Sequence, residues 1–287
     1  MADGGLPQGR RDALALDGRA PGTPRVVVLP TLDDVARAAA ERIAAAIAGA
    51  VAARGIAHVA LTGGSSATSV HRALVTTALE RPLPWRDVHL WLGDDRLVPL
   101  ADPESNGGAA AAVLLDGRLP IPAGHLHPIP SDAALRAGED EGACARAYAA
   151  ELAGLVPPGP DGWPVLDLVI LGVGSDGHCL SVFPGSAALG SLDWVLGVPA
   201  PRHIGPHLPR VTLNPAVVPA AREILAVAAG EGKAAILGEI FREPRDPRRL
   251  PAQLALRGSA TWLIDAGAAR ALPAGVADRQ DGTEERR

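Results

Sequence analysis

The sequence predicts an α/β fold with three layers, in which a Rossmann-like, mostly parallel sheet is flanked by helices. Short apolar runs typical of strands alternate with longer helical stretches along the chain. Apolar residues make up 47 % of the sequence, which allows a large core. Aromatic residues make up only 3 %, so Ala, Val and Leu must fill that core, and small side chains favour close packing of helices on a sheet.

The first third of the chain shows the alternation most clearly. Thr31 suits the N-cap of a helix whose first turn contains two aspartates, where the helix dipole favours negative charge. The predicted elements are a strand at Arg25–Leu29, a helix at Leu32–Ala53, a strand at His58–Thr62, a helix at Ala67–Leu79 and a strand at Asp87–Gly93.

A second set of elements follows after a gap. Two proline-rich segments, 201–209 and 242–251, must be loops, and either could border a site. The predicted elements are a helix at about Asp132–Leu155, a strand at Leu166–Gly172, strands near Trp194–Val198, Arg210–Leu213 and Glu223–Ala228, a helix at about Lys233–Phe241 and a last strand at Thr261–Ile264.

The ends of the chain differ from its middle. Residues 1–24 and 274–287 are rich in Gly, Pro, Arg and Asp or Glu and show no periodicity, so we expect both ends to be disordered. Residues 25–273 are expected to form a single catalytic domain, since no internal repeat recurs within them.

Charge and cysteine content restrict the partners and the compartment. The net charge of -5 and the lack of a long Lys/Arg run argue against nucleic acid or an anionic membrane, so a small molecule is the expected partner. No segment resembles a signal peptide or a membrane span. Cys144 and Cys179 are the only cysteines, which fits a reducing compartment. We expect a cytoplasmic protein.

Three motifs follow predicted strands, at the edge where open α/β sheets bind ligands. The first contains Gly63, Gly64, Ser65 and Ser66 before a helix. Glycines allow close backbone approach, and a helix N-terminus with nearby hydroxyls suits a phosphate. The alternative is a tight turn in which a serine caps the helix.

The second motif places Asp94, Asp95 and Arg96 directly after an apolar strand, with Asn106 ten residues further on. Two carboxylates and a guanidinium at the edge of a sheet could bind a polar substrate. The alternative is a solvated turn with a surface ion pair of little energetic value.

The third motif is the segment 167–185. Its residues 172–177 read G-x-G-x-x-G, which at first suggests dinucleotide binding. Pro184 and Gly185 interrupt the chain before a full helix can follow, which argues against that function. We therefore interpret the segment as a loop that positions Asp176 and His178. An imidazole at a strand end is well suited to accept a proton near neutral pH, so His178 is the candidate base.

Two further histidines, His125 and His127, could lie on one face of a strand as metal ligands. No third ligand is evident, so a structural role is favoured and no metal site is predicted.

The combination of TGGSSA, GDDRLVP with ESN, GVGSDGHCLSVFPG, and RVTLNPAVV followed by GEGKAAIL resembles the 6-phosphogluconolactonases from about residue 25 to residue 265. The resemblance implies a fold shared with glucosamine-6-phosphate deaminases and ribose-5-phosphate isomerases. It also implies hydrolysis of 6-phospho-D-glucono-1,5-lactone to 6-phosphogluconate in the oxidative pentose phosphate pathway, with no cofactor.

The resemblance also implies roles for individual residues. His178 would activate water, and Asp176 would orient the loop or the imidazole. Arg96 would contact the oxygens of the substrate, and Asp94 would organise Arg96 or the sugar hydroxyls. The phosphate would lie on Gly63, Gly64, Ser65 and Ser66, with charge from Arg210 and Lys233.

Departures from the family pattern and two rival functions remain. Cys179 replaces a usual Thr, and Gly107 replaces a usual aromatic residue. The family pattern therefore does not predict the detailed shape of the pocket. Related deaminases carry a glutamate immediately before the Pro-Gly of the third motif, where this chain has Phe183. A sugar-phosphate-binding regulator is the second rival, although neither end offers a DNA-binding module. We expect a monomer or a weak homodimer.

Overall fold

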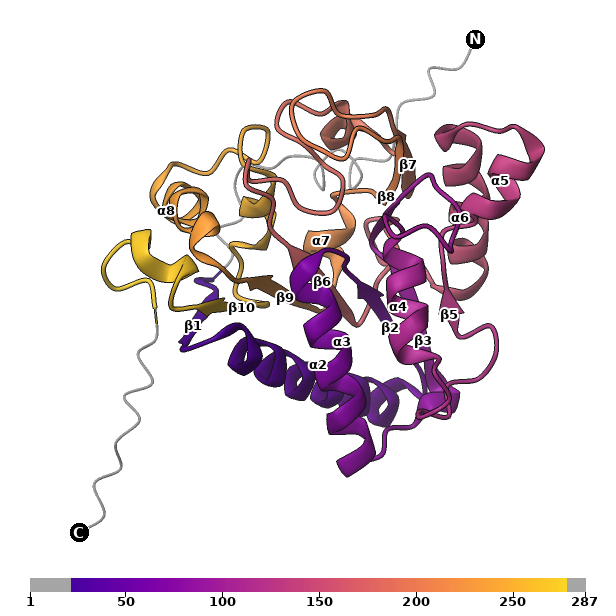
Figure 1. Cartoon of the computed structure of the whole chain (residues 1–287), viewed down its shortest axis with the longest axis horizontal. Coiled ribbons are helices and arrows are strands. Elements are labelled where there is room, and N and C mark those ends of the chain that lie inside the picture. The colour runs from indigo at the N-terminus through magenta and orange to yellow at the C-terminus, as the bar shows by residue number, and fades with distance from the viewer. Residues whose placement is uncertain (1–21, 278–287) are drawn as a thin grey trace.

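A seven-stranded parallel sheet forms the centre of the molecule in the computed structural model, which describes residues 22–277 (Figure 1). Neighbouring strands follow the order β1-β10-β9-β6-β2-β3-β5. Their bounds are β1 Arg25–Leu29, β2 Ala57–Leu61, β3 Val88–Leu92, β5 Leu126–His127, β6 Leu168–Gly172, β9 Glu223–Ala228 and β10 Ala260–Asp265.

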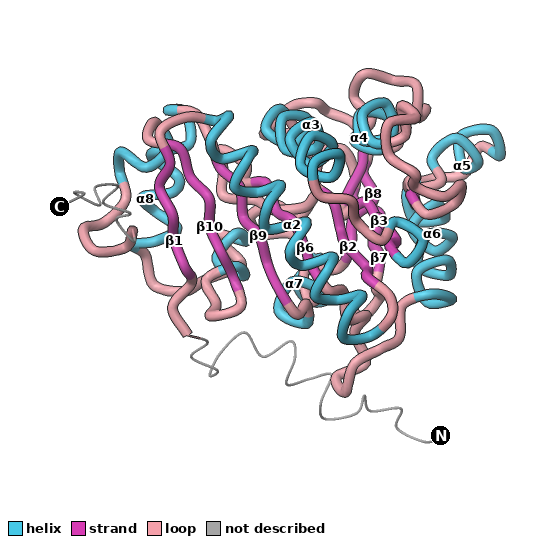
Figure 2. Tube along the Cα trace, turned by 90° about the horizontal axis from the view of Figure 1, so that it is seen from below, coloured by secondary structure: helices cyan, strands magenta, loops and turns pink. Residues whose placement is uncertain are grey.

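Helices cover both faces of this sheet, which gives the predicted three layers (Figure 2). The register places Trp91 of β3 and Trp262 of β10 on the same face, where Tyr148 and Phe241 of two helices contact them. The opposite face is covered by a long helix that contacts β2, β9 and β10. The helices are α2 Leu32–Arg54, α3 Ser65–Glu80, α4 Asn106–Leu114, α5 Ser131–Ala137, α6 Glu141–Leu155, α7 Val217–Ala220 and α8 Ala234–Arg242.

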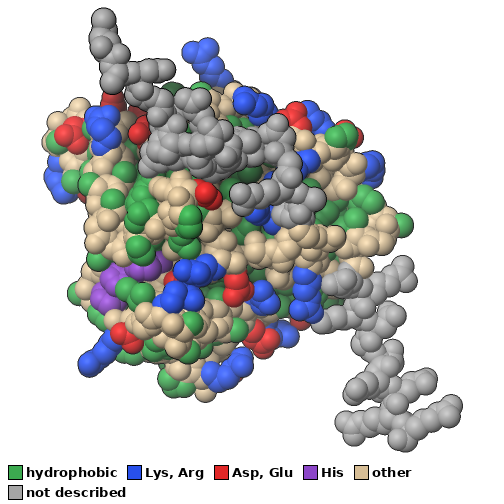
Figure 3. All heavy atoms as spheres, turned by 180° about the vertical axis from the view of Figure 1, so that it is seen from behind, with side chains coloured by type: hydrophobic (Ala, Val, Ile, Leu, Met, Phe, Trp, Pro, Cys, Tyr) green, Lys and Arg blue, Asp and Glu red, His purple; other side chains and the backbone are tan. Residues whose placement is uncertain are grey.

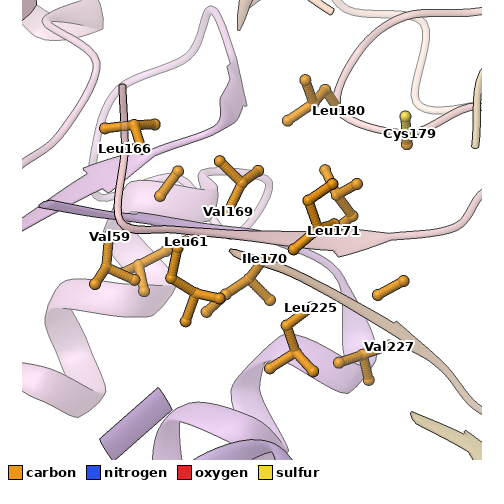
Figure 4. Close-up of a cluster of buried hydrophobic side chains, with 14 of the residues drawn as sticks. Val59, Leu61, Leu166, Val169, Ile170, Leu171, Cys179, Leu180, Leu225 and Val227 are labelled. Carbon is orange, nitrogen blue, oxygen red and sulfur yellow. The ribbon is translucent and has the colours of Figure 1, made fainter. Parts of the chain in front are cut away.

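The central strand β6 is apolar on both faces because helices cover both. Val169 and Leu171 point to one side and Ile170 to the other, where it meets Leu61 and Leu225 (Figure 4). A strand buried on both sides reads as a continuous apolar run, which is why the sequence predicted this strand clearly.

Two predicted strands lie outside the main sheet. β7 (Val195–Val198) and β8 (Arg210–Leu213) pair antiparallel with each other, and β8 pairs antiparallel with β4 (Asp94–Arg96). The sequence did not separate this small sheet from the large one, because four-residue apolar runs carry no information about their partners. The small sheet places the second motif opposite Arg210.

The single helix predicted at Asp132–Leu155 is wrong, because the structure has two helices there. Gly138 adopts the left-handed conformation that ends α5, with φ at 69°. Asp140 then caps α6 by accepting a hydrogen bond from the amide of Ala143. The sequence analysis also gave no helix at α4, whose first turn contains two glycines.

The strand order reverses between β2 and β6. From β2 the chain continues outward to β3 and β5, then returns to β6 on the other side of β2. Ligands of open α/β sheets bind at such a switch point, outside the carboxyl ends of the strands. The first and third motifs therefore start side by side, and the Thr62 hydroxyl accepts a hydrogen bond from the amide of Gly172 at 3.1 Å.

The predicted disordered ends, 1–24 and 274–287, fall almost wholly outside the described residues. Within residues 22–277, no helix is long and apolar enough to cross a membrane.

Candidate active site

A cavity of about 230 Å³ lies at the switch point, at the carboxyl ends of β2 and β6. Nine of the ten site residues expected from the sequence line it, and Asp176 lies behind His178 rather than on the wall. The nine are Gly63, Gly64, Ser65, Ser66, Asp94, Arg96, His178, Arg210 and Lys233.

The first motif forms an uncapped helix N-terminus at the wall of the cavity. Gly64 precedes α3 with φ at 91°, a conformation that favours glycine, and no side chain caps the helix there. A Cβ atom at Gly63 would collide with the side chain of Asn106, so only glycine fits. The first amides of α3 are therefore open to an anion, and the capping alternative does not hold.

The third motif holds an imidazole against a carboxylate. Nδ1 of His178 lies 2.5 Å from Oδ1 of Asp176, and the backbone amide of His178 donates to the same oxygen at 3.1 Å. A Cβ atom at Gly174 would collide with both side chains, and Gly177 has φ at 83°. The glycines of this motif thus make room for the His–Asp pair instead of a pyrophosphate.

The carboxylate of Asp176 is kept ionised by its partners. Burial alone would raise the pKa of Asp176, but hydrogen bonds and charge from His178, with a further bond from His203, hold this pKa well below the ordinary carboxyl value. An ionised carboxylate accepts hydrogen bonds only, so Nδ1 of His178 carries the proton. The Nε2 atom of His178 makes no hydrogen bond to another described residue.

Asn106 positions Arg96, which is one of the two alternative roles expected for Asp94. The guanidinium of Arg96 donates to Oδ1 of Asn106 at 2.6 Å and to the backbone oxygen of Glu104 at 2.9 Å. The carboxylate of Asp94 instead accepts a hydrogen bond from the Ser181 hydroxyl at 2.6 Å. Asp94 thus ties the second motif to the third.

Asp95 organises the start of α4. Its carboxylate accepts hydrogen bonds from the backbone amides of Arg96, Asn106 and Gly107 and from the Ser105 hydroxyl, at 2.7 to 3.0 Å. Burial raises the pKa of Asp95, and these bonds oppose that rise. The carboxylate fixes the loop that presents Asn106 to Arg96, which is a structural role.

Two arginines face each other across neighbouring strands. Arg96 of β4 pairs with Arg210 of β8 in the register of the small sheet. Burial lowers the pKa of Arg210, and its guanidinium lies 5.4 Å from the centre of the Phe183 ring. Like charges placed opposite each other destabilise a sheet, so this arrangement favours an anion that binds both.

Lys233 supplies a third cation from the turn after β9. Its side-chain ammonium makes no hydrogen bond or ion pair with another residue of the described range 22–277. Burial lowers the pKa of Lys233, while the charge of Asp176 opposes the shift. Together with the start of α3, the three cations make the cavity attractive to a phosphorylated ligand.

Ser181 and His203 contact site residues but were not predicted from the sequence. Ser181 lies within the third motif, but nothing in the sequence signals its bond to Asp94. His203 lies in one of the two proline-rich loops that could border a site, and its Nε2 lies 2.9 Å from Oδ2 of Asp176.

The histidine pair considered as metal ligands has a structural role. The ring of His127 stacks on Trp91 with 3.9 Å between ring centres, and its Nδ1 lies 2.6 Å from a carboxylate oxygen of Glu151. Over the described part of the chain, no group of three or more His, Cys, Asp or Glu side chains is arranged to hold a metal ion.

Comparison with known proteins identifies the family. Residues 30–263 match the model of the family described as glucosamine-6-phosphate isomerases/6-phosphogluconolactonase, which is most of the chain. The chain belongs to this family. Its fold and the order of its motifs agree with the resemblance seen in the sequence.

Relatives with the name 6-phosphogluconolactonase match most of the chain. The protein of that name from Mycobacterium tuberculosis is 37% identical over 256 residues, which cover 86% of this chain and 98% of the relative. The crystal structure of 6-phosphogluconolactonase from Leishmania guyanensis is 31% identical with a TM-score of 0.76, and the match covers 88% of this chain and 100% of the other.

A deaminase shares the fold at much lower identity. A monomeric glucosamine-6-phosphate deaminase matches with a TM-score of 0.71 over 86% of this chain and 99% of its own, at 18% identity. This likeness concerns the fold alone, so the choice between the two activities of the family depends on the site.

Proposed function

We propose that this chain is an enzyme that hydrolyses 6-phospho-D-glucono-1,5-lactone to 6-phosphogluconate, a step of the oxidative pentose phosphate pathway. The observation that carries the proposal is the His178–Asp176 pair facing a cavity whose other walls present Arg96, Arg210 and Lys233. The relatives with this activity in their names support it.

His178 acts as the general base in this proposal. Its Nε2 takes a proton from a water molecule whose oxygen attacks the lactone carbonyl carbon, and Asp176 stabilises the resulting imidazolium. When the bond between that carbon and the ring oxygen breaks, the imidazolium returns the proton to the ring oxygen. The products are a carboxylic acid, which then ionises, and a hydroxyl group.

The cations divide between the two ends of the substrate. Arg96, held by Asn106, faces the same cavity as His178 and is assigned to the oxyanion that develops on the carbonyl oxygen. The amides at the start of α3, with Arg210 and Lys233, are assigned to the phosphate. Asp94 is assigned to the sugar hydroxyls beside Ser181.

Phe183 favours the lactonase over the deaminase within this family. Its ring is buried, with its centre 4.8 Å from that of His178, at the position where related deaminases carry a glutamate. An apolar ring cannot transfer the protons that isomerisation and deamination require. It also keeps a second carboxylate away from the base.

A coupled assay tests the proposal directly. Freshly generated 6-phosphogluconolactone is added to the protein, and formation of 6-phosphogluconate is followed above the spontaneous hydrolysis rate. We expect clear acceleration, and no release of ammonia from glucosamine 6-phosphate. The opposite pattern would overturn the proposal in favour of a deaminase, and binding of 6-phosphogluconate without turnover would indicate a regulator.

The cytoplasmic location and the monomeric or weakly dimeric state expected from the sequence remain part of this proposal. Both cysteines are free and buried, as suits a reducing compartment. Size-exclusion chromatography with light scattering tests the oligomeric state.

A further inference from the structure

The carboxylate of Asp176 lies between two imidazoles rather than one. Its Oδ1 contacts Nδ1 of His178 at 2.5 Å, and its Oδ2 contacts Nε2 of His203 at 2.9 Å. Both imidazoles also lie against the same aromatic ring, since the centre of Phe183 is 4.8 Å from that of His178 and 5.4 Å from that of His203. The catalytic pair is therefore part of a triad of side chains around Asp176.

His203 belongs to the loop 199–209, which connects β7 to β8. Ile204 and Gly205, the next two residues, line the cavity. The loop is braced against β8, because Arg210 donates to the carbonyl oxygen of Pro206 at 3.2 Å. The contact of His203 with Asp176 joins this braced loop to the segment that carries the base.

We propose that His203 is a positioning residue that fixes Asp176 against the base and holds the loop 199–209 at the mouth of the cavity. The inference rests on the proposed function, because it gives His178 the role of base. His203 is half exposed, with 52% of its side chain accessible, whereas His178 is 18% accessible. An exposed imidazole at the rim suits a positioning role better than proton transfer inside the cavity.

Sharing the carboxylate has an electrostatic consequence. An acceptor that receives a second N–H bond interacts less strongly with the first donor, so His203 weakens the attraction between Asp176 and a protonated His178. The other charges that act on Asp176 come from Arg210 of β8 and Lys233 after β9. Both residues are unchanged in the variants compared below. Removal of His203 should thus favour the protonated base.

The test compares His203→Ala with His203→Gln and His207→Ala. The Gln amide can donate to Asp176 as Nε2 of histidine does, and His207 is an exposed histidine of the same loop that bonds a backbone oxygen instead. For His203→Ala we expect kcat/KM to fall about 3- to 10-fold at pH 7 and its acid limb to move up by roughly half a pH unit. His203→Gln should restore the limb, and His207→Ala should leave it in place.

A second measurement needs no turnover. The ring proton signals of His178, assigned by their loss in His178→Asn, are titrated by NMR in the wild type and in each variant. The His203→Ala midpoint should move upward by the same half unit. An unmoved midpoint, or an equal move in His207→Ala, would overturn the positioning role. If the wild type has no lactonase activity, the proposed function is wrong. The titration would still decide whether His203 positions Asp176 against His178.

Discussion

Two histidine–carboxylate pairs in this molecule have different surroundings. In the active-site pair, His178 donates Nδ1–H to Asp176 and its Nε2 faces the cavity. In the second, His127 donates Nδ1–H to Glu151, but its Nε2 lies 2.9 Å from Nδ1 of His89. In both pairs, Nδ1 of the histidine contacts a carboxylate oxygen. They differ in what the other ring nitrogen meets.

The second pair belongs to a histidine cluster formed by His58, His89, His125 and His127 on strands β2 and β3 and around β5. Their rings lie against one another and against Trp91, at the side of the sheet that α6 covers. Histidine side chains reach the surface on the rear face of the molecule (Figure 3). The comparison teaches that a carboxylate partner alone does not make a histidine catalytic, because a base also needs a free nitrogen in a cavity.

Replacement of His178 by Ala gives the largest expected effect. If His178 is the base, lactonase turnover should fall by ~10²–10⁴-fold, which is the usual contribution of general acid–base catalysis. The urea midpoint should change little, since the imidazole partly faces the cavity. The coupled assay and urea unfolding measure the two quantities. Turnover within a few-fold of the wild type would exclude His178 as the base.

Replacement of His127 by Ala is the matched experiment on the second pair. It removes a buried ring stacked on Trp91 and leaves Glu151 without its partner. The free energy of unfolding should fall by about 2–4 kcal/mol, as for other large-to-small changes in a core. The kcat per folded molecule should remain close to that of the wild type. A loss of turnover as large as that of His178→Ala would contradict a purely structural role for His127.

Replacement of Lys233 by Gln tests the anion end of the cavity. Loss of a charge-assisted contact of about 1.5–3 kcal/mol should raise KM for the phosphorylated lactone about 10- to 100-fold with kcat little changed. An unphosphorylated gluconolactone serves as the control substrate and should be hydrolysed as by the wild type. Equal losses on both lactones would place Lys233 outside the phosphate site.

The sequence predicted the elements of the main sheet because each is a buried apolar run between turn signals. Of its strands, β1 and β9 have the predicted bounds, whereas β5, with only two residues, was missed. The helix break at Gly138 was missed although a glycine followed by a capping aspartate is a recognisable stop and start. Predicting one long helix overlooked that signal.

The part of the site that was predicted is the part formed by motifs at the ends of neighbouring strands. The glycines of the first and third motifs follow neighbouring strands, so their convergence follows from the fold class. The bond of Arg96 with Asn106 and that of Asp94 with Ser181 depend on the small antiparallel sheet, whose pairing no local pattern announces. The contact of His203 with Asp176 likewise depends on the path of an irregular loop.

His71 of α3 differs from the histidines of both pairs. It lines the cavity as His178 does, but among residues 22–277 it has no carboxylate partner and its buried Nδ1 has no hydrogen-bond partner. Burial lowers its pKa to about 4, so the imidazole is neutral and a poor base at pH 7. Burial and the neighbouring histidines likewise lower the pKa of His89 to about 4.

These lowered pKa values predict a loss of stability in acid, which His71→Phe should reduce. Between pH 6.5 and about 4 the unfolded chain binds a proton at His71 that the folded chain rejects, so the free energy of unfolding falls as the pH falls through this window. For His71 alone the loss from pH 7 to pH 5 should be up to about 2 kcal/mol. The phenylalanine side chain binds no proton, and any cost of packing its ring is the same at both pH values. Urea unfolding of both proteins at pH 7 and pH 5 therefore isolates the contribution of the imidazole, and an equal pH dependence in the two would show that His71 accepts its proton in the folded state.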